Sequence, residues 1–261
     1  MTAAPANEVL PGSVALSGRA VNLVIDGHHI LVDVSVDVAA GEFLAIIGPN
    51  GAGKTSLINV LSVATPPTSG KVHLHGRDVT GLPPHRVARS GLGRTFQTSN
   101  LFLGRSLLEN ARLAANGRDS RLRTGFRRVL KDDPVTERAR EALDLVGLGR
   151  RPDRLASELS HGERRKLELA MVLAQGANVI LLDEPMAGVS VDDVPELVEL
   201  IRRVHREQGK TTVMVEHHMH VVLDLAERIG VMHHGAMIAI GPPDEIIAND
   251  VVQTAYMGEP L

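Results

Sequence analysis

The spacing of apolar residues predicts an N-terminal part made largely of strands. Short apolar runs rich in β-branched residues indicate strands at 20–25, 30–38, 41–48 and 71–79. The run at 41–48 is almost continuously apolar, as is typical of a strand that is covered on both faces. A segment with helical spacing, 54–63, follows it directly. This part of the chain therefore combines β ribbons with one strand–loop–helix unit.

From residue 159 onward, helical and strand patterns alternate. The expected helices are 162–175, 191–207 and 219–227, and the expected strands are 178–183, 211–217 and 228–235. Such alternation predicts a parallel sheet with helices on both faces, which is the α/β class. Between the two parts, over about residues 98–158, the spacing is helical and the polar faces are charged. We therefore expect an α/β core that is interrupted by a mostly helical lobe.

Length and composition set the limits of this organisation. The 261 residues suffice for one large domain, which we place at 18–258, with a core of 18–97 and 159–258 and a helical subdomain of about 98–158. Residues 1–17 lack the basic start and apolar run of a signal peptide, and we interpret them as a loose tail. No apolar run approaches the roughly 18 residues that span a bilayer.

Charge and cysteine content exclude some kinds of site. The net charge of −3 and the pI of about 6.5 do not resemble the basic footprint of a dedicated nucleic-acid-binding protein, so we expect no nucleic-acid partner. Cysteine is absent from the sequence, which rules out disulfides and thiolate metal sites.

One glycine-rich stretch indicates phosphate binding. Residues 48–55, GPNGAGKT, fit the pattern GxxxxGK[ST] between a predicted strand and a predicted helix. Backbone N–H groups can surround a phosphate chain there, Lys54 can reach the β and γ phosphates, and Thr55 can ligate Mg²⁺. The positive end of the following helix adds to the attraction. The expected nucleotide-binding residues are Gly48, Pro49, Asn50, Gly51, Ala52, Gly53, Lys54, Thr55 and Ser56.

A second apolar strand, in VILLDEP, ends in two acidic residues. Asp183 at its carboxyl end suits a Mg²⁺ position, usually through water. Glu184 could then orient or deprotonate an attacking water as a general base. The alternative is that the two acids only complement the dipole of a following helix. The glycine-rich loop in the same chain favours the catalytic interpretation.

Three further stretches resemble ABC ATPases. LSHGERRKLELA at 159–170 resembles the ABC signature, RTFQ at 94–97 resembles the Q-loop, and VEHHM at 215–219 resembles the H-loop segment. With the glycine loop and the two acids, five motifs occur in the order of that family, and the resemblance covers roughly residues 18–258. It implies a P-loop NTPase core of the RecA-like type with an antiparallel β subdomain and an inserted helical subdomain.

The resemblance also implies a mechanism with ATP and Mg²⁺ as cofactors. Two ATP molecules would lie between two head-to-tail subunits, and the signature residues Ser160, Gly162 and Glu163 of one subunit would cap the nucleotide on the other. His217 would bond the γ phosphate, and Gln97 would sense Mg²⁺ and water and couple them to whatever docks on the helical lobe. From the residues alone, Ser160 is a plain helix N-cap, which can hold at the same time, and Gln97 is a solvated loop residue.

Finer details resemble one branch of the family. LSHGE with LELAMVLA, DEPMAGVS, VEHHMHVV and the terminal VVQTAYMGEP are similar to the ATPase subunits of branched-chain amino acid and urea-type amide importers. The resemblance implies two transmembrane permease subunits, a second ATPase subunit, an extracytoplasmic solute-binding protein as an indirect partner, and a place at the cytoplasmic face of the membrane. The alternative is a soluble ABC ATPase that acts on ribosomes or nucleic acid.

Two positions depart from the family pattern. After the acidic pair the sequence reads AGVS, so Ser190 occupies the usual acidic position. The family normally stacks adenine on an aromatic residue upstream of the glycine loop, and the alignment puts Ile25 there. An aliphatic side chain offers no π face, so we expect modest ATP affinity and weak discrimination between ATP and GTP.

Overall fold

A six-stranded, mainly parallel sheet forms the centre of the molecule. The computed structural model describes residues 13–95, 101–117 and 133–257. The strand order is β10-β9-β3-β8-β7-β6, and only β10 runs antiparallel to its neighbour. The strands are β3 (Phe43–Ile47), β6 (Leu92–Arg94), β7 (Val179–Asp183), β8 (Thr211–Val215), β9 (Arg228–His233) and β10 (Ala236–Gly241). The predicted parallel sheet is confirmed, and the edge strands β6 and β10 are additions to it.

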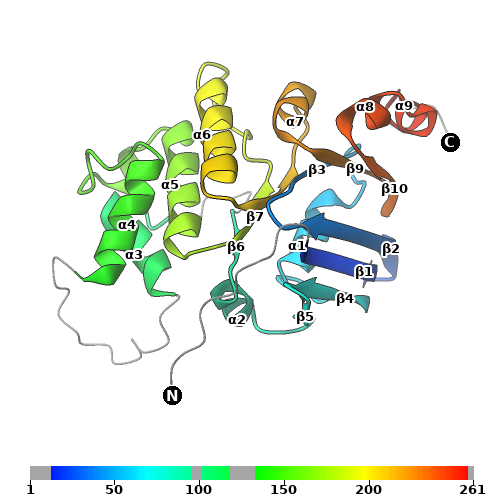
Figure 1. The fold of residues 1–261 in the computed structure, drawn as a ribbon, viewed down its shortest axis with the longest axis horizontal. Coiled ribbons are helices and arrows are strands. Elements are labelled where there is room, and N and C mark those ends of the chain that lie inside the picture. The colour runs from blue at the N-terminus through cyan, green and yellow to red at the C-terminus, as the bar shows by residue number, and fades with distance from the viewer. Residues whose placement is uncertain (1–12, 96–100, 118–132, 258–261) are drawn as a thin grey trace.

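A four-stranded antiparallel sheet lies beside this core (Figure 1). Its order is β2-β1-β4-β5, and its strands are β1 (Val14–Ile25), β2 (His28–Ala39), β4 (Ser69–Leu74) and β5 (Arg77–Asp78). The single strand expected at 71–79 is divided into β4 and β5. The division follows from the turn at His75 and Gly76, where φ is +49° and +74°.

The N-terminal boundary needs a correction. Residues 1–17 are predicted to be a loose tail, but β1 already begins at Val14. Ala15 and Leu16 are fully buried, and Leu16 pairs with Val38 on one side and Leu74 on the other. Two neighbouring strands thus satisfy the backbone of residues 14–17, and burial of the two apolar side chains holds the strand in place.

Helices surround the central sheet and form the lobe at one end of the molecule (Figure 1). They are α1 (Lys54–Leu61), α2 (Pro84–Arg89), α3 (Leu107–Asn116), α4 (Pro134–Leu145), α5 (His161–Ala174), α6 (Val194–Glu207), α7 (Met219–Leu225), α8 (Pro243–Ile247) and α9 (Asp250–Met257). A short 3₁₀ helix, Ala156–Glu158, precedes α5. The Arg-rich part of the lobe at 121–131 lies outside the described residues. Within the described ranges, no helix is long and apolar enough to cross a membrane.

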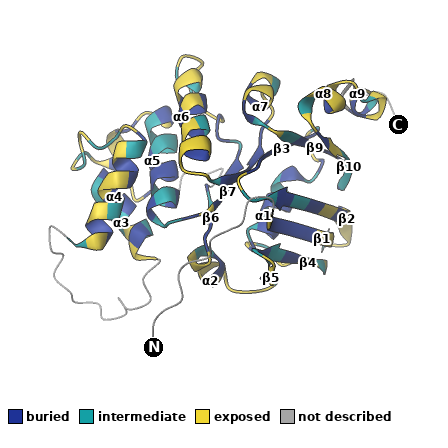
Figure 2. Ribbon diagram, in the orientation of Figure 1, coloured by how far each residue is buried: buried dark blue, intermediate teal, exposed yellow. Residues whose placement is uncertain are grey.

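The central sheet separates two hydrophobic cores. Along β3, Phe43, Ala45 and Ile47 face the core shared with the helices of the lobe, whereas Leu44 and Ile46 face the core shared with α1 and the antiparallel sheet. Figure 2 shows the resulting buried band through the middle of the molecule. A strand that alternates between two apolar cores must be apolar at every position, which explains the continuous run that predicted it.

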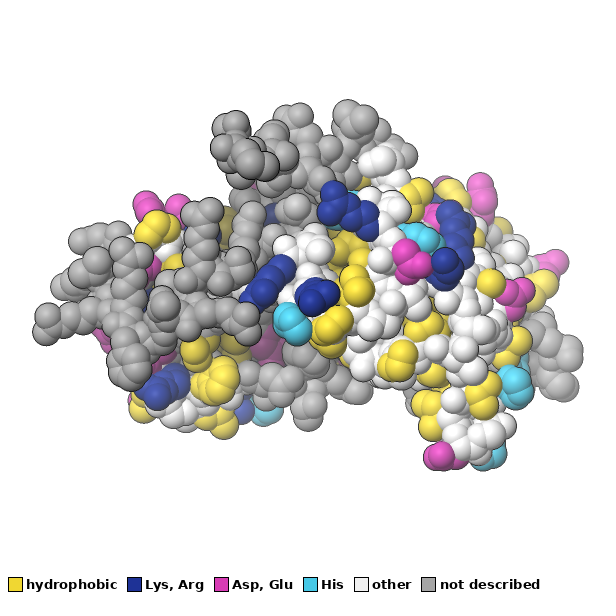
Figure 3. All heavy atoms as spheres, turned by 90° about the horizontal axis from the view of Figure 1, so that it is seen from below, with side chains coloured by type: hydrophobic (Ala, Val, Ile, Leu, Met, Phe, Trp, Pro, Cys, Tyr) yellow, Lys and Arg dark blue, Asp and Glu magenta, His cyan; other side chains and the backbone are white. Residues whose placement is uncertain are grey.

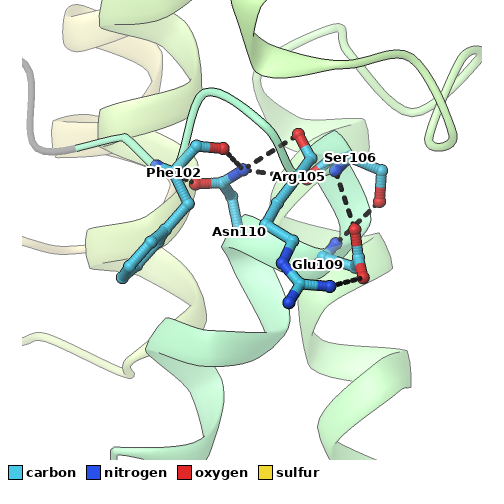
Figure 4. Close-up of polar contacts among 5 residues, drawn as sticks. All are labelled: Phe102, Arg105, Ser106, Glu109 and Asn110. Atoms are coloured by element: carbon cyan, nitrogen blue, oxygen red, sulfur yellow. Dashed lines mark hydrogen bonds and ion pairs between the residues drawn. The ribbon is translucent and has the colours of Figure 1, made fainter.

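One buried asparagine holds the loop that enters the helical lobe (Figure 4). Asn110 on α3 is fully buried. Its Oδ1 accepts from the N–H of Phe102 at 2.9 Å, and its Nδ2 donates to the carbonyls of Phe102, Arg105 and Ser106 at 3.1, 3.4 and 2.9 Å. The Asn110 side chain therefore bonds to three residues of the loop backbone and helps to fix the shape of the loop.

Replacing Asn110 by alanine should lower the free energy of unfolding by about 1–3 kcal/mol, because several buried backbone groups would lose their partner. Chemical denaturation with circular dichroism measures this change. Asn116→Ala is the matched control, since Asn116 is an exposed asparagine on the same helix and should change stability by less than about 0.5 kcal/mol. Equal effects of the two substitutions would contradict a structural role for the Asn110 network.

Candidate active site

The glycine-rich loop joins the carboxyl end of β3 to the amino end of α1. β3 ends at Ile47 and α1 begins at Lys54, as the strand–loop–helix pattern predicted. Gly48, Gly51 and Gly53 have backbone φ angles of +152°, +82° and +97°. Residues other than glycine rarely adopt such angles. The loop therefore depends on glycine for its backbone course at three positions.

Two of these glycines are also required by packing against the protein itself. A Cβ on Gly48 would lie 2.2 Å from the carbonyl oxygen of Met232 on β9, and one on Gly53 would lie 2.9 Å from that of Ile30 on β2. A Cβ on Gly51 would meet nothing within 4 Å. From the sequence, all three glycines are explained by the access that a phosphate needs to the backbone N–H groups. Contact with β9 and β2 is a second reason at Gly48 and Gly53, and it fixes the loop between two strands.

Lys54 lies over this loop. Its side chain is buried, and Nζ donates to the carbonyls of Gly48 and Pro49, each at 2.8 Å. Burial lowers the pKa of the Lys54 ammonium, while the negative charges of Glu184 and Asp183 oppose this effect. The cation is thus attached to the loop and lies within the electrostatic influence of the acidic pair.

The acidic pair stands at the same sheet edge. In the register of the sheet, Asp183 pairs with Val215, and Val215 pairs with Ile46, the residue before the end of β3. Asp183 is fully buried, and its Oδ2 accepts from Arg94 Nη2 at 2.9 Å. Burial raises the pKa of Asp183, and the Arg94 guanidinium opposes this rise.

Asp183 has one oxygen that fits a cation. Its Oδ1 is buried and has no hydrogen-bond partner within the described part of the chain. Mg²⁺ takes oxygen ligands, often one carboxylate together with phosphate oxygens and water. Asp183 and Thr55, on the first turn of α1, therefore have the chemistry that this ion requires.

Glu184 and His217 form the exposed side of the site. His217, which follows β8, lies with Nε2 3.0 Å from Oε1 of Glu184. Glu184 has a φ of +49°, and its N–H donates to the carbonyl of Val215 at 2.9 Å. Non-glycine residues adopt such angles at a cost, and they gather at functional sites. The turn carries the Glu184 side chain out of the strand to His217, while Asp183 stays inside.

Arg94 is a further residue of the site, and the sequence patterns did not single it out. Besides Asp183, its Nη1 donates to Asn59 Oδ1 at 2.7 Å and to Ser62 Oγ at 3.0 Å, both near the carboxyl end of α1. It therefore joins α1, β6 and β7 and neutralises the buried carboxylate. The available signal was a charged residue at the end of the apolar LGR strand, directly before the TFQ that drew attention to Gln97.

The signature residues belong to a different part of the molecule. Ser160 is the N-cap of α5, and its Oγ accepts from the N–H of Glu163 at 3.2 Å while Glu163 Oε2 accepts from the N–H of Ser160 at 2.9 Å. This is a capping box, so the N-cap interpretation of Ser160 is confirmed. Gly162 is buried, and a Cβ there would lie 3.3 Å from Oδ2 of Asp193. Their position on the helical side leaves their role toward nucleotide a prediction.

The remaining predicted residues stand as follows. Ala52 is buried, and Pro49, Thr55 and Ser56 are half-buried, whereas Asn50 and Gly51 at the tip of the loop are exposed. Ile25 ends β1 at its turn and is 45% exposed, so it is accessible to a ligand. Ser190 is exposed in the loop before α6. Gln97 lies outside the described residues.

Comparison with known protein families shows which family shares this sequence. Residues 31–187 match the family model described as ABC transporter. The chain is 37% identical to the high-affinity branched-chain amino acid transport ATP-binding protein LivG of Salmonella typhimurium, over 87% of this chain and 91% of that protein. It is 35% identical to the high-affinity branched-chain amino acid transport ATP-binding protein BraF of Pseudomonas aeruginosa, with 87% and 91% covered.

Solved structures agree with this assignment. A nucleotide-free ATP-binding cassette from an ABC transporter superposes with a TM-score of 0.83 at 28% identity, covering 94% of this chain and 100% of that one. A dimeric ATP-binding cassette in a post-hydrolysis state with ADP and phosphate gives a TM-score of 0.74 at 25% identity, with 87% and 98% covered. Motifs, fold and relatives coincide, and the chain belongs to the ABC transporter family of ATP-binding cassettes.

Proposed function

We propose that this protein is the ATP-hydrolysing subunit of an importer for branched-chain amino acids or related amides. The observation that carries the proposal is the meeting of Lys54, Asp183, Glu184 and His217 at the carboxyl edge of one parallel sheet. The relatives named as branched-chain amino acid transport ATP-binding proteins, matched over most of the chain, support this choice of solute. In this proposal the protein works at the cytoplasmic face of the membrane.

The loop and Lys54 are suited to hold the phosphates of ATP. Backbone N–H groups from Gly51 to Thr55 and the positive end of α1 attract negative oxygens. Lys54 adds a full charge that can pass from the carbonyls of Gly48 and Pro49 to the β and γ phosphates. Exchanging two carbonyl contacts for charge-assisted ones favours binding, because hydrogen bonds between ionised groups are the stronger.

Asp183, Glu184 and His217 have different roles in the proposed hydrolysis of ATP. Asp183 and Thr55 would hold Mg²⁺, which supplies charge neutralisation for the phosphates when it is bound. Glu184 accepts the proton of the attacking water, and His217 holds the Glu184 carboxylate in place through the 3.0 Å contact. The resemblance to the family assigns His217 a second contact, with the γ phosphate, and Gln97 a contact with Mg²⁺ and water.

A second ATPase subunit would complete each site. Ser160 is exposed at the amino end of α5, where the helix dipole favours an anion. The signature of one subunit can therefore cap the nucleotide on its partner without leaving its own capping box. Cassettes with solved dimeric structures are among the structural relatives, and they support this arrangement.

Residues 101–106, named the docking loop here, are a surface for the permease partner. Phe102 and Leu103 are 55% and 44% exposed, although the whole chain has only four phenylalanines. Asn110 fixes the loop, so the two apolar side chains are displayed on a rigid backbone. Exposed apolar side chains on a fixed support suit a hydrophobic cytoplasmic segment of a transmembrane subunit. The stretch with Gln97 leads directly into this loop.

The soluble alternative, an ABC ATPase acting on ribosomes or nucleic acid, has less support. The formal net charge is −3, and the relatives matched over most of the chain are named for transport. On the face seen in Figure 3, the Lys and Arg side chains not hidden by grey atoms lie in separate groups among apolar and neutral ones. A protein that tracks a phosphate backbone carries a continuous basic stripe.

Glu184→Gln should lower steady-state ATP hydrolysis by about 100-fold or more while ATP binding persists, because only the proton acceptor is lost. The variant should also accumulate an ATP-bound dimer. Phosphate release and nucleotide affinity measure the two effects, and Glu207→Gln, at an exposed acid on α6, is the control. Wild-type turnover in Glu184→Gln would remove Glu184 from the role of base.

Mixing two inactive variants tests the head-to-tail arrangement. Ser160→Arg and Lys54→Ala should each abolish most activity, but a hybrid dimer contains one doubly damaged site and one intact site. Equimolar mixing should therefore restore part of the activity, measured as phosphate release. Demonstrated hybrid dimers without any recovery would contradict composite sites. If the physiological partner is a different ATPase subunit, the same substitutions are divided between that pair.

Phe102→Asp should reduce recovery of the permease by at least about tenfold, because a charge would be buried in an apolar interface. The measurement is co-purification of multi-span membrane proteins from detergent-solubilised membranes of the source cell, with identification by mass spectrometry. Leu223→Asp, on α7, alters a leucine of similar exposure, 42%, and serves as control. Equal recovery with both variants would exclude the docking loop, and recovery of ribosomal proteins instead would favour the alternative function.

A further inference from the structure

Two segments of the helical lobe that are about 50 residues apart in the sequence run side by side. One contains the docking loop and the start of α3, and the other leads to α5. Ser106 and Leu155 form an antiparallel bridge between them. Four backbone hydrogen bonds of 2.9–3.0 Å add to it, from Ser157 to Leu103, from Ala156 to Arg105, from Leu107 to Arg154 and from Leu108 to Pro152. The pairing makes the two segments move as one.

The side chain of Arg154 continues this connection to α5. Its backbone carbonyl belongs to the paired segment, while its Nη1 donates to Glu163 Oε1 at 2.6 Å and its Nη2 donates to the carbonyl of Glu158 at 2.5 Å. Glu163 uses its other oxygen to accept the N–H of Ser160. One carboxylate therefore binds Arg154 and Ser160 together, with side-chain exposures of only 23% for Arg154 and 31% for Glu163.

The same lobe contains a second capping box, in which the arginine lies next to the cap residue. At the start of α3, Ser106 and Glu109 form the box, and Arg105 Nη1 donates to Glu109 Oε1 at 3.1 Å (Figure 4). There the arginine is the neighbour of the cap residue, and its side chain is 63% exposed. In α5 the arginine lies six residues before the cap residue, on the segment that is paired with the docking loop, and its side chain is more buried. The capping box of α3 forms without an arginine from the segment at 152–157. The Arg154 contact in α5 therefore has a use beyond capping the helix.

We propose that Arg154 is a positioning residue that joins the docking loop to the Ser160 end of α5. The inference rests on the proposed function, in which Ser160 caps nucleotide on the partner and the docking loop receives the permease. A shift of the docking loop moves the paired backbone of Arg154, and the guanidinium transmits this shift to Glu163 and Ser160. The Arg154 guanidinium is planar and donates through two nitrogens to Glu163 and to the carbonyl of Glu158, so it holds these groups in a defined geometry relative to the paired backbone.

The test uses the full chain in a Glu184→Gln background, with ATP as the ligand. Arg154→Ala should weaken the ATP-driven dimer by about tenfold, as followed by sedimentation, with little change in the ATP affinity of the monomer. The dimer dissociation constant of Arg154→Lys should lie between those of the parent and of Arg154→Ala. A lysine keeps the positive charge but cannot donate to Glu163 and Glu158 from two nitrogens of one planar group. If Arg154→Ala only damaged the fold, both the stability of the dimer and the ATP affinity of the monomer would fall, and Arg154→Lys would not restore them.

Arg112→Ala is the matched control. Arg112 Nη2 lies 3.6 Å from Oδ2 of Asp133, the N-cap of α4, and both side chains are about as buried as the Arg154 pair, at 17% and 26% exposed. The control thus removes an arginine from a helix-capping acid in the same lobe, at the start of α4 and not at the start of α5. It should change the dimer constant by less than about twofold.

A label on the docking loop tests the connection directly. The chain has no cysteine, so Phe102→Cys carries a single environment-sensitive fluorophore. Because coupling between sites is reciprocal, ATP-driven dimerisation should change the emission of this label. In Arg154→Ala the change should disappear, at protein concentrations where its dimer still forms.

Each outcome is decisive for one of the two proposals. If the parent with Glu184→Gln forms no dimer with ATP, either with itself or with a paralogous ATPase subunit, the proposed function fails, and this inference fails with it. If the parent dimerises but Arg154→Ala matches it in dimer constant, Arg154 does not position α5. A parent label without response to ATP, or a response that survives in Arg154→Ala, shows that Arg154 does not join the docking loop to that helix.

Discussion

Parallel pairing of β3, β8 and β7 is the constraint on which the site depends. The register aligns Ile46, Val215 and Asp183 across three strands, so that the chain leaves all three strands at one edge. The glycine loop, His217 and Glu184 follow these strand ends within two residues and meet there as a consequence. An open parallel sheet places its ligand at the carboxyl ends of its strands for this reason. Side chains from distant parts of the sequence need no further device to converge.

The arrangement of the site has an energetic cost, because the carboxylate of Asp183 is fully buried and loses its contact with water. The Arg94 guanidinium offsets this cost at Oδ2, and it leaves Oδ1 without a partner within the described residues. A buried pair of this kind contributes little net stability, since both ions lose water. What it does provide is orientation: Arg94 is also bonded to Asn59 and Ser62, so the carboxylate is fixed relative to the helix that begins in the glycine loop.

Sequence patterns revealed those features that depend on local spacing. The apolar run of β3, the glycine loop and the acidic end of β7 are each contiguous, and all three were found where the pattern placed them. Features that depend on partners far apart in sequence were missed. Arg94 is important because it binds Asp183, which lies 89 positions later in the sequence. Gly48 was predicted, but its close approach to the carbonyl of Met232 was not. The start of β1 was misplaced because its evidence lies in pairing with β2 and β4.

The helical lobe shows how one local motif acquires two different functions. Both α3 and α5 have a serine as N-cap, and a glutamate follows this serine three residues later, so the sequence alone makes the amino ends of the two helices equivalent. Tertiary structure separates them. The α3 box is closed by its exposed neighbour Arg105, whereas the α5 box is held by Arg154 from a segment that is hydrogen-bonded to the docking loop. An exposed local ion pair in a helix contributes a few tenths of a kcal/mol to stability. Arg154 is partly buried instead, and it contacts Glu163 through its side chain and the N–H of Leu107 through its backbone carbonyl. The signature helix therefore follows a segment that is hydrogen-bonded to the docking loop, as the proposed coupling between the nucleotide site and a docked partner requires.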